Sequence, residues 1–521
     1  MNSAFRNIPL MMQSNLSINT EIDSPTHSVA KRKAAWLLAL LPVNAIVWTI
    51  GAWLSRGNLD IPGDMVENYV WGIEWQAGYA KHPPFFAWIT ALWFQTFPHT
   101  DLAYFALSAL NAMVGLFGIV ALARRFLPLR LAAVAGLAMA VSPLYSTLSI
   151  KFNANAVLLS LWPWTAYFFV RFMQSGKWHS ALALGALAGA AVLGKYFSVV
   201  LLIALLMAAF ARPRWRSRVF SWQSLIVVAA GFIVLLPHLV WLVEHQFQTF
   251  EYAAQRTSGS PMAVAMGRFS IYTLAQIGYL LPSFVFVILL VKAARVKAAK
   301  QMLASCISPR MYPDLWVLTF GPFMVIGIIA IAAKAQMASV WGMAEWFAVV
   351  PMWVCVLFRM DVSLRVERSI RVLIVYWMLV LIGTAAVGYA GARRNTDDAA
   401  EPRAELADAA RAIWKRQSGQ DTIPVVSGSV HEAQSIAFYS GGRTRYWDLS
   451  APRTTPWLRS DDVRREGMLI VCRRDDASCH DEAKTFSHAL ATPIDIRRRA
   501  WGMTLPARQY AIYVLPPASS S

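Results

Sequence analysis

Long apolar runs recur between residues 34 and 390, and they constrain the fold more than any other feature of the chain. Each is close to the roughly 20 residues that a helix needs to cross the hydrocarbon core of a bilayer. The chain is 57% hydrophobic and 15% charged, which excludes an ordinary soluble domain. The runs lie at 34–54, 101–123, 131–149, 154–172, 179–194, 197–211, 221–243, 270–291, 314–333, 340–358 and 370–390. They predict a polytopic α-helical membrane protein with about eleven crossings, a count that neighbouring short runs leave open by one or two.

Basic residues predict the orientation of these crossings. The net charge is +19, but Lys and Arg are spread between the apolar runs rather than gathered on one soluble module, so the composition does not indicate nucleic-acid binding. Clusters such as Lys31-Arg32-Lys33 and Arg124-Arg125 fall in alternate loops, which the positive-inside rule assigns to the cytoplasm. We therefore expect a multi-pass membrane protein whose remaining loops face the periplasm or the cell exterior. Its N-tail, 1–33, is predicted to be cytoplasmic, and its first apolar run to be an uncleaved anchor because no small-residue cleavage site follows.

The other loops are then periplasmic, chiefly 55–100 and 244–269. The composition changes again after residue 390, and the tail 391–521 predicts a small soluble α/β domain on the outer face. Its helix is expected at 401–416, and its short buried strands at 422–426, 468–472 and 509–515. Cys472 and Cys479 would share an oxidising compartment, so they could form a disulfide or remain free thiols. The sequence has no second His or Cys pair at the spacing of a zinc site, so a structural zinc there is not indicated.

Ionisable residues follow directly after the first apolar run, from Asp64 and Glu67 to Lys81 and His82. A charged side chain in hydrocarbon costs roughly 2.5 to 3.5 kcal/mol at a helix centre, so charges beside a membrane face usually mark a working site. The aromatic residues among them are typical of a belt at the headgroup level. The second outer loop, 244–269, begins with an amphipathic, aromatic-rich stretch that suits a helix lying at the interface.

The order Asp64, Glu67-Asn68, Gly78-Tyr79, Lys81-His82-Pro83-Pro84 resembles bacterial glycosyltransferase family 39, the relatives of protein O-mannosyltransferases and lipid A aminoarabinose transferases. The resemblance continues in Leu193-Gly194-Lys195-Tyr196, in Trp241 with 246–250, and in Gln276-Ile277-Gly278. It implies a GT-C membrane fold, a polyprenyl-phosphate-linked sugar as donor and chemistry on the outer face. It also implies that Asp64 is catalytic, with Glu67 as its partner. The chain departs from the family pattern at two places. Met65 follows Asp64 where relatives often have a second acid, and the Asn/His-Trp motif expected near a late outer turn is represented only by Trp341.

The residues support the same chemistry. Sugar transfer from a lipid phosphate to a hydroxyl needs a carboxylate to take the acceptor proton and cations to stabilise the departing phosphate. Asp64 offers the carboxylate, with Glu67 as an orienting or second acid. Lys81, Lys195, Arg256 and Arg268 offer the cations, and His82, Tyr196 and Trp341 are further substrate contacts. No nucleotide-binding loop is present in the sequence. No metal site is predicted, although a divalent cation held weakly by the two acids stays open.

The predicted function is an inverting transfer of a sugar at the periplasmic face of the bacterial inner membrane. The sugar would pass from a polyprenyl-phosphate carrier to an acceptor hydroxyl or phosphate of lipid A, a glycan, a lipid or a protein. A lipid or solute transporter is the alternative, but the apolar runs are nearly free of charge and show no internal repeat. A scaffold for envelope assembly is a third option.

Single residues have structural alternatives too. Asp64 could cap the helix after Gly63, and His82 could only shape the turn before Pro83. Lys195 could extend to the headgroups, and Arg256 and Arg268 could contact anionic lipid. We interpret Glu74 as part of a solvated helix face.

Overall fold

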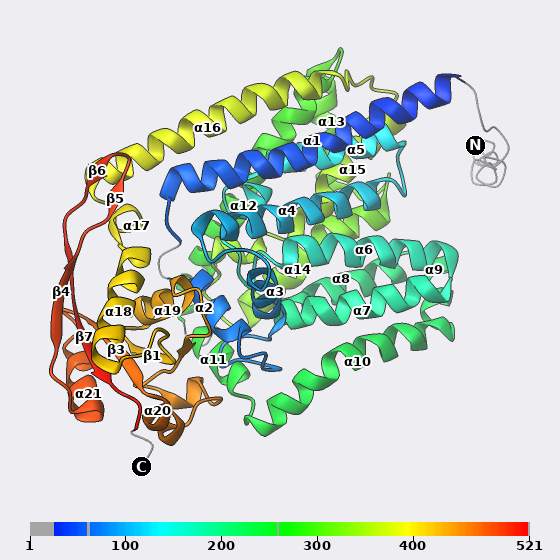
Figure 1. Ribbon diagram of the computed structural model, residues 1–521. Helices are drawn as coiled ribbons and strands as arrows, with labels where there is room; N and C mark the ends of the chain where they lie inside the picture. The colour runs from blue at the N-terminus through cyan, green and yellow to red at the C-terminus, as the bar shows by residue number, and fades with distance from the viewer. Residues whose placement is uncertain (1–24, 60–62, 258–259, 519–521) are drawn as a thin grey trace, which may run out of the picture.

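The computed structural model describes residues 25–59, 63–257 and 260–518. Figure 1 shows a bundle of long helices and, at one end of it, a smaller α/β unit drawn in yellow to red. The bundle helices are α1 (Pro25–Arg56), α4 (Asp101–Ala123), α5 (Leu129–Ala140), α6 (Leu158–Ser175), α7 (Trp178–Gly194), α8 (Val199–Phe210), α10 (Gln223–Glu244), α12 (Met262–Leu290), α14 (Pro313–Ala332), α15 (Val349–Arg359) and α16 (Arg368–Arg394). Each predicted apolar run therefore falls on a helix. Of the predicted N-tail 1–33, residues 1–24 lie outside the described residues.

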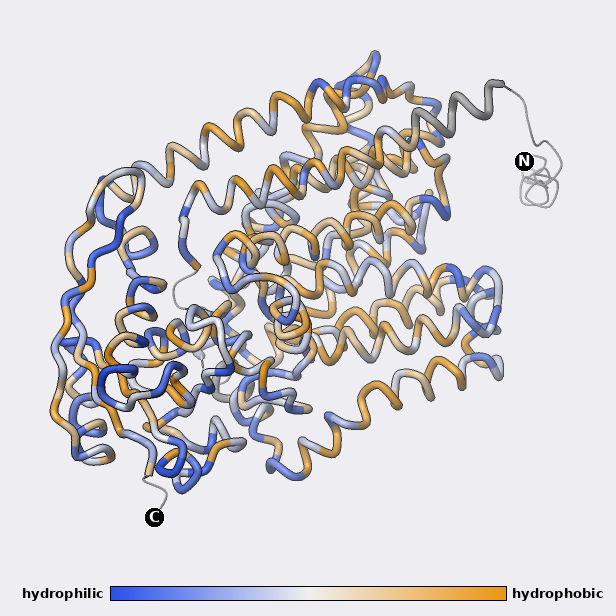
Figure 2. Tube along the Cα trace, in the orientation of Figure 1, coloured by the Kyte–Doolittle hydropathy of each residue, from blue (hydrophilic) through white to orange (hydrophobic). Residues whose placement is uncertain are grey.

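Seven stretches of the described residues are long and apolar enough to cross a membrane, judged by length and composition. They are Ala34–Arg56, Asp101–Ala123, Gln223–Glu244, Met262–Leu290, Pro313–Ala332, Ser339–Arg359 and Arg368–Arg394. The predicted count of about eleven is therefore not confirmed, because the runs at 131–149, 179–194 and 197–211 form shorter apolar helices. The first of these stops at Ala140 because Pro143 disfavours helical backbone at the residue before it. Figure 2 shows apolar residues along the bundle helices and hydrophilic ones at their ends and in the α/β unit.

Small residues let the bundle helices approach closely. A side chain at Gly185 on α7 would place its Cβ 2.2 Å from the carbonyl oxygen of Val227 on α10. One turn on, Gly189 faces the carbonyl of Gly231 on the same helix. The pair forms the small-x3-small pattern typical of tightly packed membrane helices. On the outside of the bundle, α16 exposes apolar side chains such as Leu379 and Ile382, as a lipid-facing helix does.

The α/β unit contains a five-stranded sheet in the order β2-β1-β3-β7-β4. Its strands are β1 (Val425–Gly428), β2 (Arg445–Tyr446), β3 (Met468–Arg473), β4 (Thr492–Ile496) and β7 (Arg508–Leu515). The strands β2, β1 and β3 run parallel, whereas β7 is antiparallel to both β3 and β4. The central strand β3 is buried along nearly its whole length, which explains its unbroken apolar sequence.

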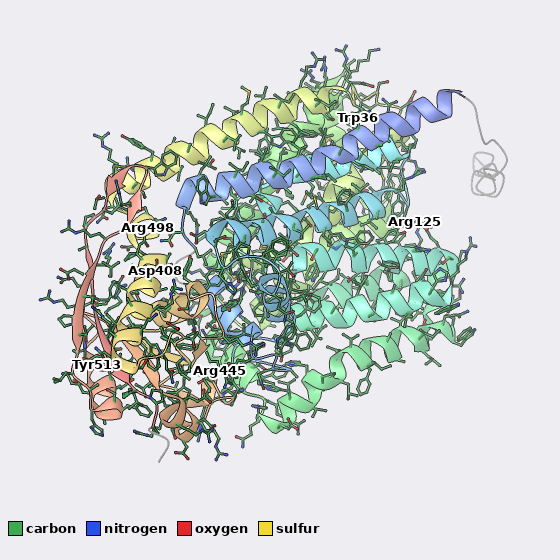
Figure 3. All side chains as sticks on the ribbon, viewed as in Figure 1. Trp36, Arg125, Asp408, Arg445, Arg498 and Tyr513 are labelled. Atoms are coloured by element: carbon green, nitrogen blue, oxygen red, sulfur yellow. A yellow bond between two sulfur atoms is a disulfide. The ribbon has the colours of Figure 1, made fainter. Side chains whose placement is uncertain are left out.

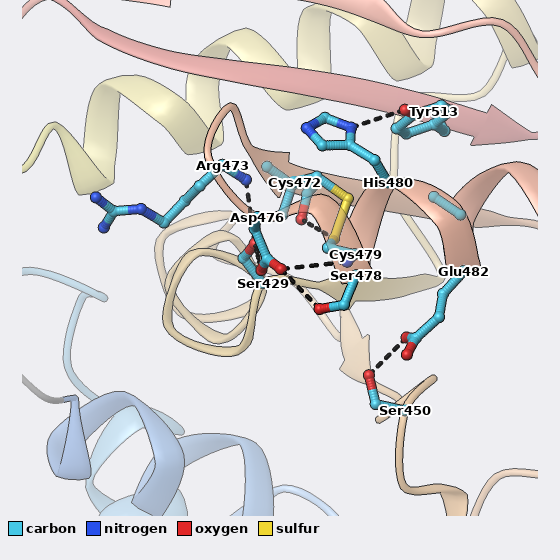
Figure 4. The surroundings of a disulfide bond; sticks show 12 residues. Ser429, Ser450, Cys472, Arg473, Asp476, Ser478, Cys479, His480, Glu482 and Tyr513 are labelled. Atoms are coloured by element: carbon cyan, nitrogen blue, oxygen red, sulfur yellow. Dashed lines mark hydrogen bonds between the residues drawn. A yellow bond between two sulfur atoms is a disulfide. The ribbon is translucent and has the colours of Figure 1, made fainter.

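The helices of this unit are α18 (Arg403–Ser418), α19 (Val430–Tyr439), α20 (Ser460–Glu466) and α21 (Ala477–Ser487). The predicted helix at 401–416 and the three predicted strands match α18, β1, β3 and β7 to within a few residues. A disulfide joins Cys472 at the end of β3 to Cys479 in α21, with the Cα atoms 5.7 Å apart (Figure 4). Asp476 caps α21 by accepting a hydrogen bond from the Cys479 N–H.

Three short helices stand apart from the long bundle helices: α2 (Asp64–Gly72), α3 (Phe85–Phe94) and α11 (Gln248–Thr257). Of these, α2 packs directly against α19 of the α/β unit. Glu74, just after α2, forms two 2.8 Å hydrogen bonds with the guanidinium of Arg445 on β2, and its side chain is only 8% exposed. The interpretation of Glu74 as a solvated residue is therefore wrong, because the α/β unit covers it.

One strongly basic segment lies away from this junction. Helix α9 (Pro213–Val219), which carries Arg214, Arg216 and Arg218, lies at the opposite end of the bundle from the α/β unit (Figure 1). Figure 3 places Arg125 at that same end and Arg445 in the α/β unit. The arginine-rich α9 and the sheet therefore lie at opposite ends of the bundle.

Candidate functional site

A cavity of about 350 Å³ lies at the end of the bundle nearest the α/β unit, and we call it the first cavity. Its lining comes from α2, the loop after it, the turn before α6, the break between α7 and α8, α11 and the segment before α15. Seven predicted site residues line it: Asp64, Glu67, Lys81, His82, Lys195, Tyr196 and Trp341. Residues that are far apart in the sequence therefore meet in one place.

Asp64 is the first residue of α2 and does not cap it. The cap is Gly63, whose φ of 99° is a backbone conformation that favours glycine, and no side chain bonds the free amides there. The Asp64 Oδ2 atom lies 3.0 Å from Lys151 Nζ and accepts a 3.1 Å hydrogen bond from Asn153 Nδ2. The alternative of a helix cap is therefore wrong. The carboxylate is held by a cation and an amide at the positive end of a helix.

Glu67 lies one turn further along α2 and pairs with Lys81. The Lys81 Nζ and Glu67 Oε1 atoms are 2.6 Å apart. Burial acts to lower the pKa of Lys81, but the Glu67 carboxylate outweighs it and raises that pKa above its ordinary value. Lys81 therefore keeps its charge throughout the neutral range.

Lys195 extends into the cavity from the break between α7 and the following 3-10 turn, η3 (Tyr196–Ser198). Its Nζ donates a 2.5 Å hydrogen bond to Asn155 Oδ1 and lies 5.2 Å from the centroid of the Trp341 ring. Burial lowers the pKa of Lys195 to about 8, although the negative charge of Asp64 acts to raise it. The cation–π contact explains how Trp341, which is distant in sequence, joins the site.

His82 and Tyr196 line the same cavity in different ways. Burial, together with the positive charges of Lys195 and Lys81, lowers the pKa of His82 to about 3, so its imidazole is neutral near pH 7. The Tyr196 hydroxyl lies 2.6 Å from His238 Nε2, and His238 Nδ1 lies 2.6 Å from the carbonyl oxygen of Ala77. Because that carbonyl only accepts, Nδ1 must donate to it, and Nε2 is left to accept from Tyr196. These two consecutive hydrogen bonds, from Tyr196 to His238 and from His238 to Ala77, fix the orientation of the Tyr196 ring.

Of the remaining two predicted site residues, the structure places the side chain of one. Arg268 is exposed on α12 and does not line the first cavity. Arg256 lies in α11, but its side chain is outside the described residues. Among the residues with described positions, no group of three or more His, Cys, Asp and Glu side chains is arranged to hold a metal ion.

The sequence interpretation missed three polar partners, Lys151, Asn153 and Asn155. They lie together in the turn between α5 and α6, where the chain reads Lys-Phe-Asn-Ala-Asn. Two amide side chains and a lysine among apolar residues were the feature of the sequence that could have indicated these partners. The sequence gave no indication of which charged groups these side chains would contact, so they were not among the predicted site residues.

Comparisons with known proteins give a consistent result. Residues 81–241 match the family model described as dolichyl-phosphate-mannose-protein mannosyltransferase. The lipopolysaccharide core galacturonosyltransferase RgtB of Rhizobium johnstonii is 27% identical over 245 residues, which are 44% of this chain and 45% of that protein. RgtA of the same organism, a lipopolysaccharide core galacturonosyltransferase too, is 27% identical over 196 residues, 36% of this chain and 39% of RgtA. The chain thus matches less than half the length of these relatives.

The fold also has a solved counterpart. The crystal structure of ArnT from Cupriavidus metallidurans bound to undecaprenyl phosphate superposes with a TM-score of 0.58 at 16% identity. The superposition covers 93% of this chain and 98% of that one. The resemblance seen in the sequence is therefore confirmed: residues 81–241 match the mannosyltransferase family model, the curated relatives are named glycosyltransferases, and the chain has the fold of ArnT.

Proposed function

We propose that the protein is an integral membrane glycosyltransferase that moves a sugar from a polyprenyl-phosphate carrier to an acceptor at the periplasmic face. The first cavity carries this proposal, because it joins the carboxylates Asp64 and Glu67 to the ammonium groups of Lys81 and Lys195 at the end of an apolar bundle. An anionic lipid headgroup needs such cations, and its hydrocarbon tail needs the bundle. The undecaprenyl phosphate bound to ArnT supports a carrier of this class.

The residues suggest a single displacement. The acceptor oxygen attacks the anomeric carbon from the face opposite the phosphate, and its proton passes to Asp64. The bond from the anomeric carbon to the phosphate oxygen breaks, and its electron pair leaves with the polyprenyl phosphate. The sugar configuration is therefore inverted.

Each side chain has a role in this step. Lys151 and Asn153 hold Asp64 as a carboxylate aimed into the cavity, while Lys81 and Lys195 stabilise the charge that develops on the phosphate. Glu67 holds Lys81 in place. Lys195 contributes as a point charge beside Trp341. Tyr196, fixed by His238, is a further substrate contact, and His82 packs there as a neutral ring.

The same proposal includes the topology and the domains. We place residues 34–390 in the membrane part, 391–521 in a periplasmic domain, and the N-terminus in the cytoplasm. The separation of the arginine-rich α9 from the α/β unit supports this orientation. A bacterial inner membrane is the compartment in which such a carrier meets a periplasmic acceptor. The transporter alternative is not favoured, because the matching family and the named relatives are transferases.

The test compares membranes that contain the wild type or Asp64→Asn for transfer of radiolabelled sugar from undecaprenyl phosphate. We expect Asp64→Asn to slow transfer by about 10²- to 10⁴-fold, the usual contribution of a general base. Asp408→Asn, an exposed acid on α18, is the matched control and should transfer at the wild-type rate. Equal transfer by Asp64→Asn and the wild type would remove Asp64 from the mechanism. Sugar movement without a new glycosidic bond would favour a transporter.

A further inference from the structure

A second cavity, of about 360 Å³, lies beside the first and is closed on its far side by the α/β unit. Glu67, Lys81 and Tyr252 line both cavities. The far wall includes Gln434 on α19 and Tyr446 on β2. The two cavities therefore adjoin at Glu67, Lys81 and Tyr252.

The Tyr446 hydroxyl is a buried polar group in the wall of the second cavity. Its side chain lines the cavity and is only 3% exposed, yet its hydroxyl has no hydrogen-bond partner among the described residues. A buried hydroxyl without a partner is unfavourable, and native structures rarely leave one so. Burial and the negative charges of Asp448 and Glu67 raise the pKa of Tyr446 well above its ordinary range. The group stays protonated and can both donate to and accept from a ligand.

The two cavities differ in charge. The first is lined by two carboxylates and two ammonium groups, and Lys151 lies directly behind Asp64. Among the described residues, the second is lined by the carboxylates of Glu67, Glu251 and Asp448 and by the ammonium of Lys81. A phosphate is therefore favoured in the first cavity and repelled in the second.

The rest of the lining suits a sugar ring. Trp71, Tyr252 and Tyr446 offer aromatic surface, and the amides of Gln248 and Gln434 both donate and accept hydrogen bonds. A mostly apolar pocket with a few convergent polar groups is the usual form of a small-ligand site. The acids and amides can accept bonds from hydroxyls without requiring a charge on the ligand.

We propose that the second cavity is the acceptor subsite, and that it takes an uncharged, hydroxyl-rich sugar residue rather than one bearing phosphate or carboxylate. This inference rests on the proposed function. The acceptor ring contacts Tyr446 and Gln434, and its reacting hydroxyl points past Glu67 toward Asp64. The nucleophile is then a sugar hydroxyl and not a phosphate oxygen.

The test uses the full chain in lipid nanodiscs and two photoreactive glycolipids that differ in one group. One probe is a neutral diglucosyl lipid, and the other carries a phosphate on its terminal glucose. We expect the neutral probe to label peptides that contain Gln434 or Tyr446 at least tenfold more than the phosphorylated probe does. Tyr446→Phe should lower that labelling severalfold, while labelling by photoreactive undecaprenyl phosphate stays unchanged.

Tyr513→Phe is the matched control. It removes one hydroxyl from the same sheet, where Tyr513 lies 2.8 Å from His480 Nδ1, but that residue does not line the cavity. It should label as the wild type does. Gln434→Leu, which removes a second polar group of the wall, should act like Tyr446→Phe and shows whether the effect of one variant comes only from misfolding.

The outcomes separate this inference from the proposed function. Equal labelling by both glycolipids, or unchanged labelling in Tyr446→Phe and Gln434→Leu, would overturn the acceptor subsite. Sugar transfer that prefers the phosphorylated glycolipid would also overturn it and leave the glycosyltransferase proposal intact. Labelling of the Tyr446 wall by the neutral probe, with no transfer to any acceptor, would support the binding site and contradict the transferase.

Discussion

Lys195 is a charged residue of the first cavity whose protonation changes near neutral pH. Its ammonium lies between Asn155 and the Trp341 ring, where burial lowers its pKa to about 8. A lysine is protonated below its pKa, so Lys195 carries charge at pH 7 and loses it as the pH rises through 8. Lys81 does not share this behaviour, because Glu67 raises its pKa.

We therefore expect kcat/KM for the polyprenyl-phosphate donor to fall above pH 8 by roughly tenfold per pH unit, as the protonated fraction of the free enzyme falls. Lys195→Arg keeps a positive charge at every pH in this range. Its profile should stay flat from pH 8 to 10, even if its activity is lower. Initial rates at low donor concentration provide the measurement. An alkaline fall with the same midpoint in Lys195→Arg would show that another group titrates.

Close helix contact is the property to test at the scale of elements. Adding a methyl group at Gly185 would bring it 2.2 Å from the Val227 carbonyl, so α7 and α10 must separate. We expect Gly185→Ala to destabilise the bundle by about 1–3 kcal/mol, as overpacking does. Gly383 on α16 has open space at the same position, so Gly383→Ala should be neutral or slightly stabilising. Thermal unfolding in detergent measures both, and equal melting temperatures for the two variants would contradict the contact.

The sequence predicts elements well where a local pattern determines them. The run at 101–123 coincides with α4, Asp101–Ala123, because apolar residues fill the span and Thr100 caps its start. The run at 131–149 was too long, since Pro143 ends the helical conformation that hydropathy alone would continue. In the α/β unit, β3 was predicted from its apolar residues. Hydropathy shows where helices lie, but backbone chemistry decides where they stop.

At the scale of the whole molecule, the sequence predicted the ingredients of the site better than their partners. The resemblance and the outer-loop charges indicated Asp64, Glu67 and Lys195, and the structure brings all three to one cavity. Lys151 was not chosen, because its pairing with Asp64 depends on how a distant turn packs. Glu74 was misread for the same reason, since its partner Arg445 lies 371 residues away. Periodicity reports local exposure and cannot reveal which later segment will cover a residue.

The Glu74–Arg445 pair gives the last prediction, because it joins the first outer loop to β2, the strand that also holds Tyr446. Glu74 is nearly buried and Arg445 about one-third exposed, so the pair is only partly screened by water. We expect Glu74→Gln and Arg445→Gln each to destabilise the junction by about 1–3 kcal/mol. The double variant should lose less unfolding free energy than the two single variants lose together, because removing both partners leaves no uncompensated charge.

Thermal unfolding and limited trypsin digestion of the α/β unit measure this coupling. The exposed pair Asp408–Arg411 on α18 is the matched control, and its cycle should give at most about 0.5 kcal/mol. Transfer to acceptors should fall with the loss of coupling, because Tyr446 lies next to Arg445 and moves with it, whereas binding of undecaprenyl phosphate in the first cavity should persist. Strictly additive effects, or donor binding lost together with transfer, would show that the pair does not position the acceptor wall.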